Sequence, residues 1–510
     1  MKKKLLWFTI SLLLLVACQL PFLPVQTTET ETPATVTVEP VPIKPEPTPG
    51  EDQFAIFRDG LIPAQSALLD ALSGASFYTI EFTIQDDILN TTGTEEVHYT
   101  NREDVPLEEI YFRLLPNVLN GDMKVASIRV NDQPFEPIYE LENSLMRVPL
   151  YQPLQPGDSV DIAIKFSVTV PSAIESNYGI LAYYDGVLTL AHSYPMIAVY
   201  DDEGWNAEIP PNQGDPTYAD ASFFIVTVDA PSELVLVGSG REISREKNGG
   251  RQIVTYAAGP ARDFYLAASA DYEVTSQTIG EVTFNSYAAT GMAKGAQVAI
   301  DVAAKAFDYF GKQFVPYPYT EFDIISTPTY ALGIEYPGVI AITDRLYNMD
   351  NSTYDLPNST LMETTVAHEA GHQWFYNLVG NDQLDEPWLD ESLTQFVTWQ
   401  YYADQYGENG SIGFEESLYA RWSRVYEDIP IGKPVAEYDG ASYSAIIYGR
   451  GAFFFEALRD KIGTDNFDDF MKDYVVSNSW GIGTGENMKE LAEKHCGCDL
   501  TKLYNQWVTP

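Results

Sequence analysis

The chain has 510 residues, 45% of them hydrophobic and 20% charged, a size that predicts two or three domains rather than one core. Thirty lysines and arginines face 73 aspartates and glutamates, which gives a formal net charge of -43. A surface this negative repels phosphate backbones, so we exclude nucleic acid as a partner. The acidity fits a solvated exterior, salty surroundings, or a field that attracts cationic substrates such as peptides with a free amino terminus.

Residues 1–18 have the pattern of an export signal. Three lysines at positions 2–4 precede the apolar run 5–17, which is shorter than the roughly 20 residues of a spanning helix. The run ends in Leu-Val-Ala-Cys at 15–18, which resembles the lipobox of bacterial lipoproteins. This resemblance implies that Cys18 becomes the acylated first residue of a membrane-anchored protein, at the cell surface or in the periplasm. An uncleaved anchor and an ordinary signal peptide that contains a cysteine are the alternatives.

Residues 19–51 form the next segment, with eight prolines among threonine, valine and glutamate. Such a composition cannot pack a core, and it predicts an extended, semi-rigid tether. The folded part is therefore expected to begin at residue 52.

Residues 52–275 are expected to form a mainly-β domain. Segments 78–84 and 160–166 alternate apolar with polar residues, the period of a half-buried strand. Turn-forming clusters at 131–134, 155–158 and 247–250 separate such segments.

Residues 276–510 are expected to form a mixed α/β domain that ends in a short helical tail. Apolar residues recur at helical spacing in 293–310, and two strand-like segments follow at 322–325 and 339–342. Further helices are predicted at 364–378, 387–406 and 445–461, with the tail at 467–507 and little more than one helical pair after residue 461.

His368 and His372 stand four residues apart in His-Glu-Ala-Gly-His, so both imidazoles leave the same helix face. This spacing suits two of the three protein ligands of an open tetrahedral zinc site. Glu369 lies between them and is placed to take a proton from a bound water. The alternative is a helix face with two incidental polar residues.

Glu391 follows His372 after eighteen residues, on the next predicted helix, within Trp-Leu-Asp-Glu-Ser. A connection of that length can return a carboxylate to the third zinc position. The pattern resembles the aminopeptidase N-type gluzincins, whose Trp-Leu-Asn-Glu-Gly retains the ligand glutamate. Here Asp390 and Ser392 replace an amide and a glycine.

Two further segments are similar to that family. The segment Leu332-Gly333-Ile334-Glu335-Tyr336-Pro337 resembles its Gly-x-Met-Glu-Asn motif, with Ile for Met and Tyr for Asn. This resemblance implies an edge strand that pairs with the peptide, with Glu335 on the substrate's α-amino group. A turn carboxylate is the alternative for Glu335. Residues 447–452 resemble the family's Tyr-Glu-Lys-Gly-Ala, which implies that Tyr448 stabilises the oxyanion; Tyr443 and Tyr438 are the alternatives.

The resemblance covers residues 76–507 and implies a saddle-like β domain resting on a thermolysin-like domain with one zinc ion per chain. Peptides with a free amino terminus are the implied substrates, with Glu369 as general base and Tyr448 as oxyanion stabiliser. The large helical domain of longer members has no room here, so we expect an open cleft. The alternatives are a zinc endopeptidase with the same centre and an inactive surface binding protein. The sequence does not predict the oligomeric state.

Cys496 and Cys498 are the cysteines that remain beside Cys18. An exported protein can join them in a small disulfide, and we interpret the pair as structural. His98 and His192 are expected to be ordinary residues of the β domain.

Overall fold

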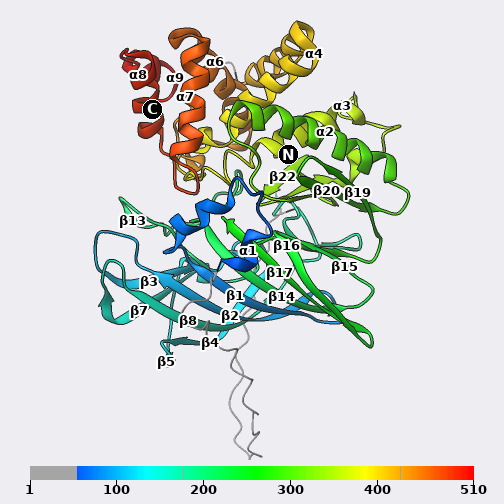
Figure 1. The fold of residues 1–510 in the computed structure, drawn as a ribbon, viewed down its shortest axis with the longest axis vertical. Helices are drawn as coiled ribbons and strands as arrows, with labels where there is room; N and C mark the ends of the chain where they lie inside the picture. Colours follow the sequence, from blue (N-terminus) through cyan, green and yellow to red (C-terminus); the bar gives the residue numbers. More distant parts are fainter. Residues whose placement is uncertain (1–53, 176, 426, 510) are drawn as a thin grey trace, which may run out of the picture. The chain divides into compact units, whose positions relative to one another are not determined.

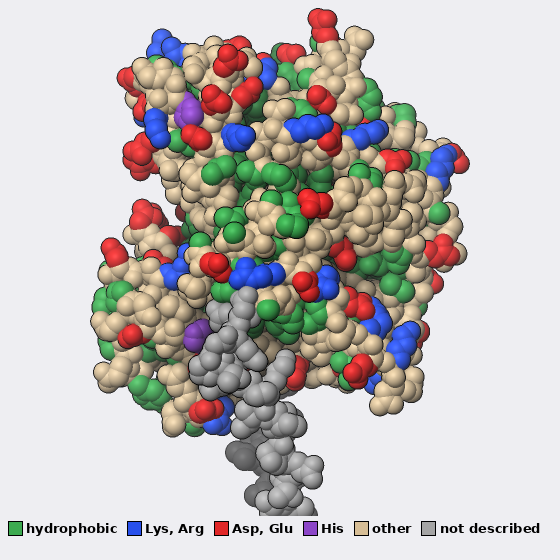
Figure 2. All heavy atoms as spheres, viewed as in Figure 1, with side chains coloured by type: hydrophobic (Ala, Val, Ile, Leu, Met, Phe, Trp, Pro, Cys, Tyr) green, Lys and Arg blue, Asp and Glu red, His purple; other side chains and the backbone are tan. Residues whose placement is uncertain are grey.

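The computed structural model describes residues 54–175, 177–425 and 427–509. The predictions for the export signal, Cys18 and the tether therefore fall outside the described residues. Within these ranges, no helix combines the length and the apolar character needed to cross a membrane. Sheets fill the lower half of Figure 1 and most helices the upper half. Figure 2 shows carboxylates scattered over both halves of the same face.

The N-terminal region is built on an eight-stranded sheet. Its order is β16 (Arg241–Asn248), β17 (Arg251–Ala261), β14 (Ser222–Pro231), β1 (Phe77–Ile84), β2 (Asn90–Thr100), β8 (Ser159–Thr169), β4 (Asp122–Val130) and β5 (Gln133–Phe135). Burial alternates along β1 and β8, as their sequences predict, so one face of each strand joins the core.

Smaller sheets complete this region. One contains β15 (Val235–Gly238), β18 (Leu266–Ser269), β10 (Val187–Leu190) and β9 (Leu181–Tyr184), and another β11 (Met196–Ile197), β3 (Leu107–Arg113), β7 (Leu145–Leu154) and β6 (Ile138–Glu140). The strands β12 (Tyr200–Asp201) and β13 (Gly204–Trp205) form a two-stranded ribbon. His98 pairs with the exposed Asp161, and His192 is buried among β-region residues.

The C-terminal region begins with a five-stranded sheet of order β19 (Tyr272–Ile279), β20 (Val282–Ala289), β21 (Glu321–Thr327), β23 (Val339–Thr343) and β22 (Gly333–Tyr336). The β22 strand is an edge strand and runs antiparallel to β23. Since β19 starts at Tyr272, this sheet begins just before the expected division at residues 275 and 276. The division itself stays a prediction. The helix α2 (Ala293–Gln313) packs its buried alanines and phenylalanines against β20.

The helix α3 (Asn358–Gly371) ends seven residues before the predicted position 378. That prediction was wrong because the backbone leaves the helix after His372, and Tyr376 has a φ of 130°. The carbonyls of Asn377 and Leu378 accept hydrogen bonds from Arg262 of the β region instead of continuing a helix. Nearly every apolar residue here is buried, so the pattern could not separate a helix from a buried loop.

The helix α4 (Glu391–Trp422) also differs from the prediction 387–406. Residues Pro387–Leu389 form a separate 3-10 turn, and Glu391 is the first residue of α4. The predicted end at residue 406 agrees with a break at Gly407, whose φ of 63° is non-helical and suits glycine, and a second helical segment follows this break to Trp422.

The predicted helix at 445–461 is divided into α5 (Gly440–Ala445), a π-helical turn η7 (Ile446–Arg450) and α6 (Gly451–Ile462). In the described part of the chain, residue 461 is followed by α7 (Thr464–Ser477), α8 (Gly485–Cys496) and the seven-residue α9 (Thr501–Trp507), where the sequence predicts little more than one helical pair. Cys496, the last residue of α8, is joined to Cys498 by a disulfide.

Candidate active site

Three buried side chains meet in a triangle of potential metal ligands: His368 of α3, His372 directly after α3, and Glu391 at the start of α4. Nε2 of His368 lies 3.1 Å from Oε2 of Glu391 and 3.2 Å from Nε2 of His372. The third side, from Nε2 of His372 to the same carboxylate oxygen, measures 3.5 Å.

These distances fit a tetrahedral zinc ion. Ligand atoms at about 2.0 Å from a tetrahedral centre are separated by about 3.3 Å, which lies within the spread of the three sides. Two imidazoles and one carboxylate leave a fourth position for water or substrate, as in catalytic zinc sites. The donor set and its spacing therefore suit zinc.

A close approach of the two helices makes the triangle possible. A Cβ atom on Gly371 would lie 2.9 Å from Cγ2 of Thr394, so glycine allows α3 to touch α4. His372 directly follows Gly371, and Glu391 precedes Thr394 by one helical turn. The contact thus places both ligands side by side.

His372 is held from its far side. Its Nδ1 lies 3.0 Å from the carbonyl of Phe375, to which it can donate, and 2.7 Å from Oδ1 of Asp390. Burial alone lowers the pKa of His372, but Glu335 and Asp390 outweigh it and the net shift is upward. A carboxylate behind a ligating imidazole fixes its tautomer with Nδ1 protonated and Nε2 free for the metal. The sequence marked Asp390 as a departure from the family but not this contact.

Glu335 and Glu369 form a second acidic group against His372. The edge strand β22 carries Glu335, and a Cβ atom on Gly333 would lie 2.4 Å from Oε1 of Glu369. Glycine at 333 therefore lets the strand run directly beside the Glu369 carboxylate. Burial raises the pKa of both glutamates well above the usual range, against the opposing influence of His372. Among the described residues, Oε2 of Glu369 has no hydrogen-bond partner.

Tyr448 reaches the triangle from η7. Its hydroxyl donates a hydrogen bond to Oε1 of Glu391, and its ring centroid lies 6.2 Å from that of His368. Ser392 fixes this turn on α4, because its hydroxyl donates to the carbonyl of Ile447 at 2.7 Å. The serine that replaces the family's glycine thus helps to position Tyr448.

Asp215, from the loop before β14, is a site residue that the sequence analysis missed. Its side chain lies within hydrogen-bonding reach of Glu391, and burial, followed by Glu391 and Asp390, raises the pKa of Asp215 to about 8. The loop is fixed by Gln213, whose Nε2 donates to the carbonyls of Val435 and Tyr438. The loop has no periodic pattern that would mark Asp215 as a site residue in the sequence. Only the tertiary fold brings this side chain to the metal triangle.

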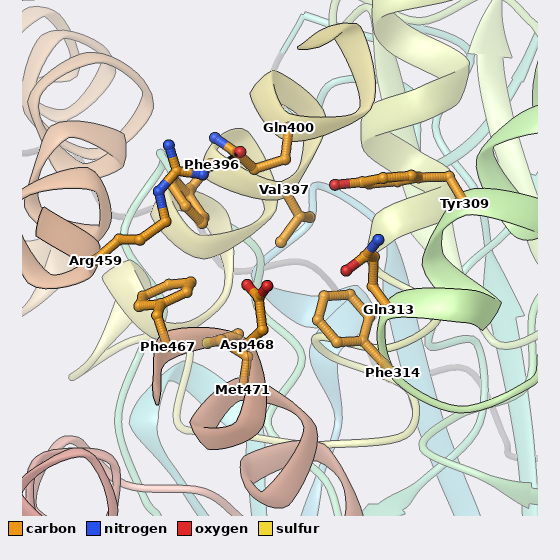
Figure 3. A pocket seen from close by; sticks show the side chains of 10 residues that line it. All are labelled: Tyr309, Gln313, Phe314, Phe396, Val397, Gln400, Arg459, Phe467, Asp468 and Met471. Carbon is orange, nitrogen blue, oxygen red and sulfur yellow. Dashed lines mark hydrogen bonds between the residues drawn. The ribbon is translucent and has the colours of Figure 1, made fainter. Parts of the chain in front are cut away.

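A pocket on another part of the helical region is separate from this site (Figure 3). Side chains from α2, α4, α6 and α7 line it: Tyr309, Gln313, Phe314, Phe396, Val397, Gln400, Arg459, Phe467, Asp468 and Met471. Arg459 donates hydrogen bonds within this group to Gln400 and outside it to Glu456. None of the metal-triangle residues borders the pocket, so it is not part of the candidate active site.

The fold and the site define a class: a mixed α/β domain with a His-Glu-x-x-His and glutamate centre of the gluzincin type, preceded by a β region. Residues 298–507 match the model described as "Peptidase family M1 domain".

Two sequence relatives illustrate the match. The chain is 29% identical over 300 residues to Aminopeptidase M1 of Arabidopsis thaliana, which covers 56% of this chain and 34% of that protein. It is 24% identical over 349 residues to Aminopeptidase 2 of Candida albicans, covering 61% and 36%. The chain thus spans about a third of the length of these curated relatives.

A solved structure shares the fold over most of both chains. The M1 zinc metallopeptidase of Deinococcus radiodurans is similar with a TM-score of 0.65 and 20% identity, over 86% of this chain and 94% of that one. The two-region architecture is therefore that of a known M1 structure.

Proposed function

We propose that this protein is a zinc-dependent aminopeptidase that hydrolyses the first peptide bond of substrates with a free amino terminus. The observation that carries the proposal is the triangle of His368, His372 and Glu391, with sides of 3.1 to 3.5 Å, directly beside the edge strand that carries Glu335. A metal centre beside an open strand edge can hold an extended peptide against its hydrolytic groups.

His368, His372 and Glu391 would hold the ion. When bound, zinc lowers the pKa of a water molecule and polarises a carbonyl group. Glu369 is buried beside the triangle with one carboxylate oxygen unpaired among the described residues, so it can accept the proton of the attacking water and pass it to the leaving amine. The Tyr448 hydroxyl can turn from Glu391 to the carbonyl oxygen, where it stabilises the developing negative charge.

Glu335 supports removal of a single residue from the amino terminus. It is buried at the end of β22, so an ammonium group is a favourable partner for its carboxylate. Asp215 adds a second acid on this side of the site. A mutant of the Deinococcus enzyme has been solved with the tripeptide Tyr-Ser-Ala bound, which is consistent with a peptide substrate here.

The test is a panel of aminoacyl-anilides assayed with and without a chelator, and in free and N-acetylated forms. We expect hydrolysis of the free forms, loss of activity with the chelator, recovery with added zinc, and no cleavage of the acetylated forms. Equal cleavage of the acetylated forms would favour the endopeptidase alternative. No cleavage by the zinc-loaded protein would contradict the proposal.

We also propose that the chain is an exported lipoprotein anchored through Cys18. The support is the order of lysines, apolar run and Leu-Val-Ala-Cys at residues 2–18, followed by a proline-rich segment. Two or more acyl chains on one cysteine anchor a protein to a membrane more firmly than one acyl chain does. Fractionation and mass spectrometry of the expressed protein should detect an acylated Cys18 at the new amino terminus, and Cys18→Ala should release the protein from membranes.

A further inference from the structure

Among the described residues, the guanidinium of Arg421 has no hydrogen-bond or ion-pair acceptor. Arg421 lies in the last turn of α4 and is only partly exposed. Of the arginines in the described ranges, Arg102 and Arg424 also lack a hydrogen bond or ion pair, but both are exposed. In a chain with 73 acids and 30 bases, a half-buried arginine with no carboxylate at ion-pair distance among the described residues is unexpected.

The guanidinium lies on the Tyr448 side of the metal triangle. Its central carbon is 5.5 Å from the centroid of the Tyr448 ring, and the same ring lies 6.2 Å from that of His368. Gly449 creates this arrangement, because a Cβ atom there would lie 2.8 Å from the backbone nitrogen of Trp422. The η7 turn therefore touches the end of α4, and Arg421 lies over the ring of the tyrosine proposed to face the scissile carbonyl.

Two acids of the site, Glu335 and Glu369, lie on another side, against His372. Oε1 of Glu335 lies 3.9 Å from Nδ1 of His372, and Glu369 belongs to the same cluster. Glu335 therefore contacts the site through His372, whereas Arg421 contacts it through the Tyr448 ring, which neighbours His368. A peptide with its amine at Glu335 and its first carbonyl at Tyr448 directs its following residues away from Glu335.

We propose that Arg421 binds a carboxylate on the leaving-group side of the scissile bond, which makes di- and tripeptides with a free carboxyl terminus the preferred substrates. This inference rests on the proposed aminopeptidase function. A planar guanidinium can donate two parallel hydrogen bonds to a carboxylate, and partial burial strengthens such a pair. An acidic side chain in the second or third residue offers the same chemistry from another source.

The test compares leucyl-glycyl-glycine as the free acid with its carboxyl-terminal amide, by kcat/KM on the zinc-loaded enzyme. We expect the free acid to be preferred by about tenfold to a hundredfold, the range for a charge-assisted hydrogen bond. Arg421→Gln should bring the ratio of acid to amide close to one, and Arg421→Lys should leave it intermediate. The control Arg424→Gln removes the same charge from an exposed neighbour and should retain the wild-type ratio.

A second arm identifies the source of the carboxylate. Among amidated tripeptides, glutamate in place of glutamine as the second residue should restore part of the preference if side-chain carboxylates also bind Arg421. Calorimetry on the zinc-loaded Glu369→Gln variant measures dissociation constants for the same pairs of peptides. Because this variant should not cleave them, the binding preference is measured independently of turnover.

A wild-type ratio near one with intact hydrolysis of aminoacyl-anilides would overturn the inference and leave the proposed function standing. An equal loss for acid and amide in Arg421→Gln would also overturn it, since Arg421 would then only hold the Tyr448 ring. If wild type cleaves neither anilides nor peptides, the proposed function fails, and the calorimetric ratio still tests the carboxylate site.

Discussion

Oδ1 of Asp390 lies 2.7 Å from Nδ1 of His372, on the side of the imidazole away from the metal triangle. Both side chains are buried, so water does not screen the contact. The acid takes the place of an amide in the related aminopeptidase motif, and it makes His372 a stronger donor through its other nitrogen.

Asp390→Asn should therefore weaken zinc binding. We expect about a tenfold lower affinity, the lower end of the range for loss of a partner behind a metal ligand. Competition with a chromophoric chelator measures this without any assay of turnover. Asp385→Asn, on an exposed aspartate of the same loop, is the matched control, and an unchanged affinity in Asp390→Asn would contradict the role.

Glu369→Gln should retain one zinc ion per chain and lose turnover. The amide cannot accept the proton of the attacking water, so kcat should fall by about a hundredfold to ten-thousandfold. Zinc content by atomic absorption, together with anilide hydrolysis, checks both parts. Glu416→Gln, on the exposed face of α4, should behave like wild type. Activity retained in Glu369→Gln would remove Glu369 as the base.

Tyr448→Phe should lower kcat by about a hundredfold, because one donor to the developing oxyanion is lost. KM should change much less, since the hydrogen bond is needed mainly in the transition state. Steady-state kinetics on one anilide is the measurement. Tyr438→Phe is the comparison, because its hydroxyl donates to the carbonyl of Pro430 rather than to Glu391. Equal losses in the two variants would argue against a special role for Tyr448.

Glu95→Gln should stabilise the protein at alkaline pH. Glu95 is 1% exposed in β2, neither of its carboxylate oxygens has a hydrogen-bond partner among the described residues, and burial raises its pKa well above the usual range. When the pKa of a group is higher in the folded than in the unfolded protein, its protonated form stabilises the fold. This stability is fully present below the unfolded-state pKa of about 4.3, and it is lost as the pH rises towards the folded-state pKa.

The gain from Glu95→Gln should therefore be about 2 kcal/mol at pH 8 and shrink towards pH 5. Urea unfolding at both pH values measures it. Glu96→Gln, on the exposed face of the same strand, should show no such pH-dependent difference. A gain in unfolding free energy that is larger at pH 5 than at pH 8 would contradict the predicted direction of the pH dependence.

Arg262→Met should destabilise the contact between the β region and the helical region. The buried guanidinium donates to the carbonyls of Ala219, Asn377, Leu378 and Gly481 at 2.6 to 3.3 Å. Its loss leaves several buried acceptors unpaired, which should lower the unfolding free energy by about 3 to 5 kcal/mol. The control Arg129→Met, at an exposed arginine, should change the unfolding free energy by less than about 0.5 kcal/mol. An equally small change in Arg262→Met would contradict the prediction.

Local patterns predicted much of the fold. The alternation in 78–84 and 160–166 identified β1 and β8, and the helical spacing in 293–310 identified α2, because each element has one buried and one exposed face. The same reasoning failed after Gly371, where Trp374, Phe375 and Leu378 are all buried. Without an exposed face there is no period to detect, and the helix was predicted too long.

The sequence by itself determined the chemistry of the site, since the spacing of His368, Glu369, His372 and Glu391 follows from helix geometry and a connection of fixed length. Only the tertiary structure decided what surrounds these residues. Asp215 comes from the β region, Asp390 lies behind His372, and Arg421 returns to Tyr448 after α4 changes direction at Gly407. These contacts join residues far apart in the chain or depend on side-chain direction, and neither is encoded in a local period.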